Sequence, residues 1–229
     1  MTGPDRAAEL AALAGPVRAQ FEASHQAREA GLAACRRTIR GASQLVRAVH
    51  RRRPDEVKAR MEEVSAAMRD AQTALAPHPD VAFAGFLHDA EKEYSEGMLL
   101  AALVDGTPLP DHAALGVRPA AWLRGLAEAA SELRRHLLDR LRDDDAAEAE
   151  RLLRAMEDVY DLLVTVDYPD AITGGLRRTT DALRPVLERT RADLTLTLVQ
   201  GRIRASIEGM AAQQPPAEPL ESGPPGEYL

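Results

Sequence analysis

The sequence has one cysteine, few aromatic residues and no long apolar run. With Cys35 as the only cysteine in 229 residues, the chain has neither an internal disulfide framework nor a multi-cysteine zinc site, and we expect a reducing, cytoplasmic location. No stretch approaches the roughly 20 apolar residues that span a bilayer, and the first residues lack the apolar core of a signal peptide. We therefore expect a soluble protein without a membrane partner. Aromatic residues make up 3% of the chain and strand-length runs of Val, Ile and Thr are missing, which favours an all-α fold.

Acidic residues exceed basic ones, but the basic residues are unevenly distributed. The net charge of −7 argues against a general nucleic-acid coat. Residues 36–53, however, contain seven arginines and one histidine and no acid. On a helix, one face of this segment, hereafter the basic face, carries Arg36, Arg40, Ser43, Arg47, His50 and Arg51, and apolar residues fill the opposite side. An ordinary solvated helix usually mixes both signs of charge, so we interpret the basic face as an anion site in preference to a plain solvated surface.

Prolines and glycines divide the sequence into about seven predicted helices. These are residues 5–50, with Gly15-Pro16 as a candidate interruption, and residues 55–75, 80–105, 111–115, 119–142, 146–166 and 176–208. Residues 168–175 are expected to form a loop, and Pro185 is expected to kink or restart the last helix. We predict a single helical domain over residues 1–210, followed by a disordered, proline-rich tail over residues 211–229.

Two pairs of glutamates occupy two of these predicted helices. Glu93 and Glu96 are three residues apart, within the apolar stripe of residues 80–105. Glu128 and Glu132 are four apart on residues 119–142, on a face with small residues such as Gly125 that let a neighbouring helix approach closely. A carboxylate that faces a core needs a cation, a hydrogen-bond partner or a raised pKa.

Three explanations for these glutamates compete. Arginines of neighbouring helices could neutralise Glu93 and Glu96 through salt bridges. A divalent cation accounts better for four converging acids, and all-oxygen ligands favour Mg²⁺, Mn²⁺ or Ca²⁺ over zinc or copper. Such an ion beside a basic face suits phosphodiester hydrolysis, because it lowers the pKa of bound water and stabilises charge on the phosphate. The third explanation, a di-iron bundle, requires two Glu-x-x-His elements. Only Glu22 and His25 have that spacing, so one required element is missing.

Four segments, in the same order, resemble the translin family, most closely its single-chain prokaryotic, archaeal-type members, the translin-like ribonucleases. The segments are CRRTIRGASQLVRAVHRRR, FAGFLHDAEKEYSEGMLL, LRGLAEAASELRRHLLDRLR and RLLRAMEDVYDLLVTVDYPDAITGGLRRTTDALRPVLERTRADLT. Together they lie within residues 29–204. The resemblance implies an all-α, translin-like bundle of about seven helices that assembles into a closed, barrel-like homo-oligomer, typically an octamer.

The resemblance also implies a function. In the family, translin mainly binds single-stranded RNA and DNA, whereas translin-associated factor X is a Mg²⁺-dependent endoribonuclease with Glu-x-x-Glu on one helix and Asp-x-x-x-Glu on another. Here these patterns read Glu93 with Glu96 and Glu128 with Glu132, so glutamate replaces the aspartate. Since all four acids are retained, we expect a Mg²⁺- or Mn²⁺-dependent endoribonuclease that cleaves single-stranded or short RNA inside the shell. The alternatives are a non-catalytic protein that binds single-stranded RNA or DNA, and an oligomer that serves only as a scaffold.

The expected residue roles divide between metal and nucleic acid. Glu93, Glu96 and Glu132 are predicted to ligate the metal, with Glu128 as a further ligand or as the group that orients the attacking water. Nucleic-acid binding is predicted for Arg36, Arg40, Arg47, His50 and Arg51 of the basic face, and for Arg134 and Arg135, which adjoin the acids.

Overall fold

The computed structural model describes residues 5–212 and shows nine helices and no strand in that range. Six helices are long: α1 (Arg6–His50), α2 (Pro54–Leu75), α4 (Phe86–Asp105), α6 (Pro119–Arg142), α7 (Ala146–Val164) and α9 (Leu176–Ala212). The helices α3 (Pro79–Ala82), α5 (His112–Leu115) and α8 (Asp170–Thr173) are single turns. The predicted all-α fold is confirmed. Of the tail predicted over residues 211–229, residues 211–212 instead end helix α9, and the rest lies outside the described residues.

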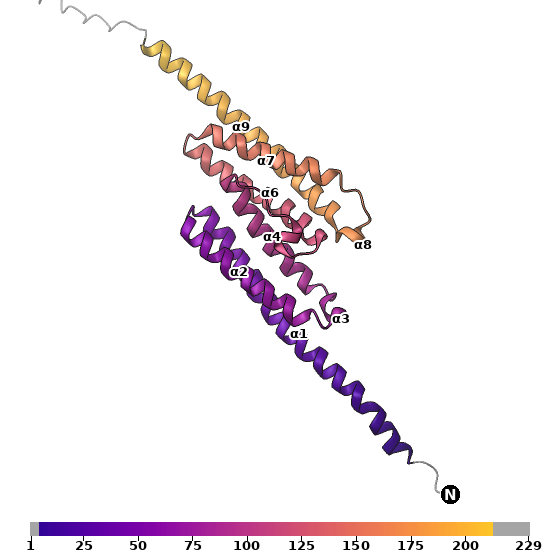
Figure 1. Ribbon diagram of the computed structural model, residues 1–229. Helices are drawn as coiled ribbons and strands as arrows, with labels where there is room; N and C mark the ends of the chain where they lie inside the picture. The colour runs from indigo at the N-terminus through magenta and orange to yellow at the C-terminus, as the bar shows by residue number, and fades with distance from the viewer. Residues whose placement is uncertain (1–4, 213–229) are drawn as a thin grey trace, which may run out of the picture.

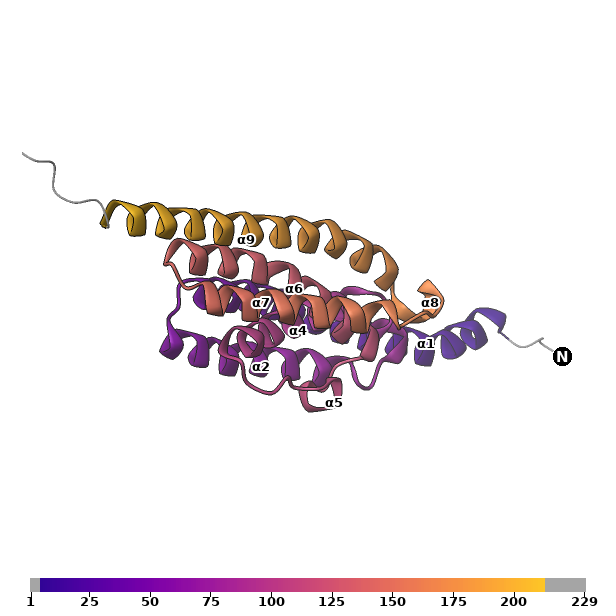
Figure 2. The ribbon, with the colours of Figure 1, turned by 90° about the horizontal axis from the view of Figure 1, so that it is seen from above.

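The long helices lie beside one another in a row. Helix α1 pairs with α2, α4 packs against α1 and α6, and α6 packs in turn against α7 and α9 (Figure 1). Seen from above, α9 and α2 lie on opposite sides of the molecule, with α4, α6 and α7 between them (Figure 2). The amino-terminal part of α1 and the carboxy-terminal part of α9 project from opposite ends of the bundle (Figure 1).

The core lies between the six long helices. Its largest fully buried side chains include Leu45, Leu100, Leu126, Leu133 and Met156. Helix α4 is central and is buried on most of its circumference, which is why its few charged side chains have well-defined partners. Among the helices of residues 5–212, none combines the length and the apolar composition needed to cross a bilayer.

Most predicted helix boundaries agree with the structure, because prolines and glycines set them. Helices α2 and α6 have Pro54 and Pro119 in the first turn, where the missing N–H costs no hydrogen bond. The prediction of one helix over residues 80–105 is wrong. Helix α3 ends at Ala82 and α4 begins at Phe86, after Gly85 with a φ of 97°, a conformation that glycine adopts at little cost.

Three smaller differences concern prolines and a loop. Helix α1 runs through Pro16 without a break; the side chains around it are exposed, so no packed neighbour resists a local bend. Helix α9 likewise continues through Pro185, as far as Ala212. The predicted loop over residues 168–175 contains the single-turn helix α8, which ends at Gly174 with a φ of 63°.

Candidate metal centre

A close contact between α4 and α6 at Gly125 positions the acidic residues. A Cβ atom at this position would lie 2.6 Å from the Cβ of Ser95, 2.8 Å from the carbonyl oxygen of Lys92 and 2.9 Å from the backbone nitrogen of Glu96. Only glycine fits this space, and the predicted close approach of a neighbouring helix is confirmed. The contact places Glu128, one turn further along α6, beside the turns of α4 that carry Glu93 and Glu96.

Three of the four predicted acids come together at this contact. One carboxylate oxygen from each of Glu93, Glu96 and Glu128 lies within 4.8 Å of the other two, and all three side chains are partly buried. Within residues 5–212, this is the only such group of three or more His, Cys, Asp and Glu side chains. The donor set consists of oxygen alone, which is the type that Mg²⁺ and Mn²⁺ prefer.

Lys92 neutralises part of this cluster. Its Nζ donates a hydrogen bond to Glu128 Oε2 at 2.7 Å and lies 2.9 Å from Glu93 Oε1. Burial alone would lower the pKa of Lys92, but the two carboxylates outweigh it and raise the pKa above its ordinary value. One ammonium group cannot balance three carboxylates, so the cluster retains room for further positive charge.

Glu96 shows this excess of negative charge most clearly. Burial, followed by the charges of Glu93 and Glu128, raises its pKa from 4.5 to about 8, and Lys92 opposes the rise only through its charge. Without a cation, the Glu96 carboxyl therefore keeps its proton at pH 7. A metal ion would compete with that proton, because a carboxylate must be deprotonated to serve as a ligand.

In the metal-free protein, Glu96→Gln is expected to raise the melting temperature at pH 8.5 by several degrees. Because the folded-state pKa of Glu96 lies above its unfolded value, the folded protein holds a proton that the unfolded chain has lost, and stability falls as the pH rises from about 4.5 to about 8. Glutamine does not ionise and avoids this loss. Thermal unfolding in the presence of EDTA measures the difference, which should vanish near pH 4. A lower melting temperature of the variant at pH 8.5 would contradict the raised pKa.

Glu132 lies against His50 instead of joining the other three acids. Its Oε2 is 2.8 Å from His50 Nε2 of α1, and this hydrogen bond, more than the nearby charge of Arg135, lowers the pKa of Glu132. The side chain of His50 is only 4% exposed. His50 therefore does not belong to the exposed part of the basic face. The role of Glu132 as a metal ligand stays a prediction.

The two arginines of α6 that follow Glu132 differ in their surroundings. Arg134 donates hydrogen bonds to Thr190 Oγ1 at 3.0 Å and to Asp193 Oδ2 at 2.7 Å, both on α9. It is therefore held by α9, and a contact with a phosphate at the acidic cluster would require those bonds to break. Arg135 is exposed, and its nucleic-acid role stays a prediction.

The remaining basic face is exposed, and the opposite side of α1 is buried, as predicted. Arg36, Arg40, Arg47 and Arg51 are exposed. The ion pairs of residues 36–53 within the described chain are formed instead by Arg37, Arg52 and Arg53, apart from the His50–Glu132 pair. On the buried side lies Cys35, whose pKa burial raises to about 11, so that it is a core residue and not an ionised nucleophile at neutral pH.

Glu91 is a buried acid that the sequence did not single out. It is the most buried acid of α4, at 3% exposure, whereas the side chain of Glu93 is 29% exposed. Its Oε2 accepts a hydrogen bond from Arg118 Nε at 2.6 Å. Burial raises the pKa of Glu91, and Arg118 opposes the rise. This ion pair holds the start of α6, the helix that carries Gly125, against α4.

Comparisons with known proteins decide the family. No family model matches the chain. An uncharacterized protein of Methanocaldococcus jannaschii, MJ0175, is 30% identical over 183 residues, which cover 79% of this chain and 81% of that protein. A solved structure of an AfC3PO–duplex RNA complex is 29% identical, with a TM-score of 0.75, and covers 81% of this chain and 96% of its own. AfC3PO is a structure of the translin type. The chain belongs to the translin family.

Other solved structures agree with this membership. A second crystal structure of AfC3PO is 28% identical and has the same TM-score of 0.75. The structure of apo-NeC3PO is 15% identical, with a TM-score of 0.73 over 86% of this chain, and shows the shared fold alone. In this translin-family chain, the acids quoted above for the nuclease pattern lie on α4 and α6.

Proposed function

We propose that this translin-family chain is a Mg²⁺- or Mn²⁺-dependent endoribonuclease. The observation that carries the proposal is the convergence of Glu93, Glu96 and Glu128 with only one lysine to balance them. Family membership supports it, as does the AfC3PO structure that contains duplex RNA. RNA is therefore the proposed ligand, and duplex as well as single-stranded RNA are candidate substrates.

The three clustered glutamates are the residues that would hold the ion. When bound, a divalent cation supplies a water of lowered pKa and stabilises negative charge on the phosphate. Glu96 gives up its proton to become a ligand. The Lys92 ammonium, released in part from Glu93 and Glu128, is then available to contact a phosphate oxygen as a point charge.

The basic face supplies the attraction for the RNA backbone. Its exposed arginines are free to replace the counterions of phosphates, which makes binding depend strongly on salt. The contact between His50 and Glu132 joins this face of α1 to the side of α6 that carries Glu128. A strand bound along α1 is therefore led towards the acidic cluster, while few exposed aromatic side chains are present to stack on its bases.

A metal-dependence assay tests the proposal. Labelled single-stranded and duplex RNA are incubated with the purified protein in Mn²⁺, in Mg²⁺ or in EDTA. We expect cleavage with either metal and none with EDTA. Equal cleavage in all three conditions would indicate a metal-independent nuclease and would contradict the proposal.

One observation favours a second candidate, a non-catalytic RNA- or DNA-binding protein. Lys92 already bridges Glu93 and Glu128, so part of the cluster is neutral without any metal. This candidate predicts salt-sensitive binding of single-stranded nucleic acid and no cleavage under any of the three conditions of the assay. The two candidates therefore give opposite results in Mn²⁺.

We further propose that the chain assembles into a homo-oligomer, with an octamer as the expected form. The support is a stripe of exposed apolar side chains on the projecting part of α1, of which Leu13 is 64% and Phe21 is 70% exposed. The projecting part of α9 carries a second stripe, which includes Ile203 and Ile207. Apolar stripes of this kind are typical of interfaces between subunits.

Charge placed on the α1 stripe is expected to dissociate the assembly. In Phe21→Lys, a buried contact between copies would contain an unpaired ammonium group, which costs several kcal/mol. Sedimentation equilibrium of the wild type and the variant measures the change in mass. Ala19→Lys, on the opposite side of the same helix, is the matched control and should leave the mass unchanged. An oligomer that persists in Phe21→Lys would exclude this stripe as an interface.

A further inference from the structure

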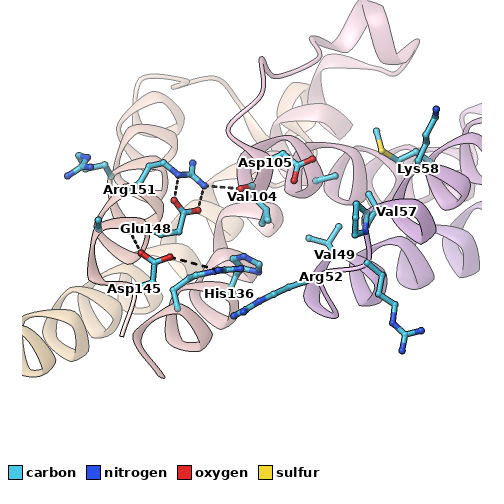
Figure 3. A pocket seen from close by; sticks show the side chains of 17 residues that line it. Val49, Arg52, Val57, Lys58, Val104, Asp105, His136, Asp145, Glu148 and Arg151 are labelled. Atoms are coloured by element: carbon cyan, nitrogen blue, oxygen red, sulfur yellow. Dashed lines mark hydrogen bonds and ion pairs between the residues drawn. The ribbon is translucent and has the colours of Figure 1, made fainter. Parts of the chain in front are cut away.

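A second site lies where the ends of five helices meet. A cavity of about 850 Å³ is bounded by the carboxy-terminal ends of α1, α4 and α6 and by the amino-terminal parts of α2 and α7 (Figure 3). Its lining does not include the four glutamates discussed above. The volume falls in the range of roughly 300–1,000 Å³ that is typical of small-molecule sites.

One part of the cavity wall is apolar. Val57 and Met61 of α2 face it from one side, Ala101 and Val104 of α4 from another, and Val49 is buried at the end of α1. A flat organic ring that packs against such a surface is removed from water, which favours its binding.

The rest of the wall carries an excess of positive charge. Six basic side chains line the cavity and three acidic ones oppose them: Arg52, Arg53, Lys58, Arg140, Arg151 and Arg154 against Asp105, Asp145 and Glu148. Both oxygens of Glu148 are engaged by Arg151, at 2.6 and 2.8 Å, and Asp145 caps the start of α7 and lies 3.9 Å from Arg140. Acids outside the lining pair with three of the arginines: Asp143 with Arg52, Glu56 with Arg53 and Glu150 with Arg154. These pairs lie at the solvent-exposed rim, where ion pairs contribute little, so an incoming anion can replace the acids. Arg and Lys are the usual partners of phosphate.

Two buried nitrogen atoms of this wall have no hydrogen-bond partner within residues 5–212: His136 Nδ1 and Arg140 Nε. His136 is only 2% exposed, and in Figure 3 its ring points into the cavity. Burial, followed by the charges of Arg140 and Arg52, lowers the pKa of His136 to about 4. The ring is thus neutral at pH 7 and offers both a donor and an acceptor. Buried polar groups normally have partners, so these two atoms indicate a polar ligand.

We propose that this cavity binds a nucleoside monophosphate. Arg140, Arg52 and His136 receive the phosphate, and the apolar wall formed by Val57 and Val104 receives the base. A nucleoside monophosphate fits this lining because it combines a compact anion with a flat ring that can lie on aliphatic side chains. Binding here does not depend on RNA cleavage at the glutamate cluster.

Isothermal titration of the full chain with AMP, adenosine and inorganic phosphate as probes tests the proposal. AMP is expected to bind at least about tenfold more tightly than either of its parts, because only AMP uses both walls. Arg140→Met should weaken AMP binding by about tenfold or more. Arg142→Met, which removes an arginine two residues away that is 76% exposed and outside the lining, should leave it unchanged.

A second variant and a second measurement keep the test decisive if Arg140→Met does not fold. Ala147→Trp fills the cavity from its exposed rim and should abolish AMP binding without disturbing the core. In an NMR titration, AMP should raise the pKa of His136, since a nearby anion favours the charged ring. Affinity for phosphate or adenosine equal to that for AMP, no AMP binding at about 1 mM, or unchanged binding in Ala147→Trp would overturn the proposal.

Discussion

Glutamine in place of Glu93 is expected to reduce Mn²⁺-supported RNA cleavage by at least about 100-fold. The substitution keeps the shape of the side chain, so the packing of α4 against α6 should survive. It removes one anionic oxygen from the cluster of three, and Lys92 would then pair with Glu128 alone. The single-turnover rate on labelled RNA is measured over a titration of Mn²⁺. The Mn²⁺ concentration at half-maximal rate reports metal binding, and the rate at saturating Mn²⁺ reports the chemical step.

The control for Glu93→Gln is Glu150→Gln, which makes the same change of charge on the exposed surface of α7. The Glu150 side chain is 47% exposed and lies 3.9 Å from Arg154, an arrangement that contributes little at a surface. Its cleavage rate should match that of the wild type. RNA affinity should not fall in either variant, because both lose a negative charge. A Glu93→Gln rate within about threefold of wild type would remove Glu93 from the metal centre.

Valine at position 125 is expected to destabilise the protein by at least about 3 kcal/mol and to disable the metal centre. Two of the three atoms that a Cβ would meet, the carbonyl oxygen of Lys92 and the backbone nitrogen of Glu96, belong to the main chain of α4. A change of rotamer cannot relieve such contacts, so α4 and α6 must move apart. Glu128 would then be drawn away from Glu93 and Glu96, and Mn²⁺ affinity should fall together with stability.

Urea denaturation and Mn²⁺ titration together measure the effect of Gly125→Val. The matched control is Gly201→Ala, in the projecting part of α9, where a Cβ would meet nothing within 4 Å. A glycine in an open helix costs stability relative to alanine, so this variant should be neutral or more stable by about 0.5–1 kcal/mol. If Gly125→Val unfolded at the same urea concentration as the wild type, the close contact would not define the site.

The fold could be predicted closely because local features set most of its elements. Prolines in first turns and glycines at helix ends mark the boundaries of α2, α5 and α6. The break between α3 and α4 was missed because Gly85 stands in a segment that otherwise has helical spacing, and only its backbone conformation, with a φ of 97°, shows that the helix restarts. The single turn of α8 is likewise too short for periodicity to reveal.

The candidate site could be predicted only in part, because it depends on contacts between helices. The spacing of Glu93 and Glu96 places them on one side of α4, and Gly125 marks the close approach of α6. Sequence spacing does not show that Lys92 reaches Glu128 across that contact, since chain adjacency relates Lys92 only to Glu93. It also does not show that His50 turns inward to Glu132, because the helical wheel places His50 beside exposed arginines.

In the proposed metal centre, α4 and α6 meet closely enough for Glu93, Glu96 and Glu128 to bind one divalent cation. The most direct test of this site is a crystal structure of the protein soaked in Mn²⁺, with the anomalous signal of manganese measured. We predict one strong anomalous peak within ligand distance, about 2.0–2.3 Å, of oxygen atoms from all three glutamates, with Lys92 displaced from between Glu93 and Glu128. A map without that peak, with Lys92 still bridging both carboxylates at full Mn²⁺ concentration, would exclude a cation site at this contact.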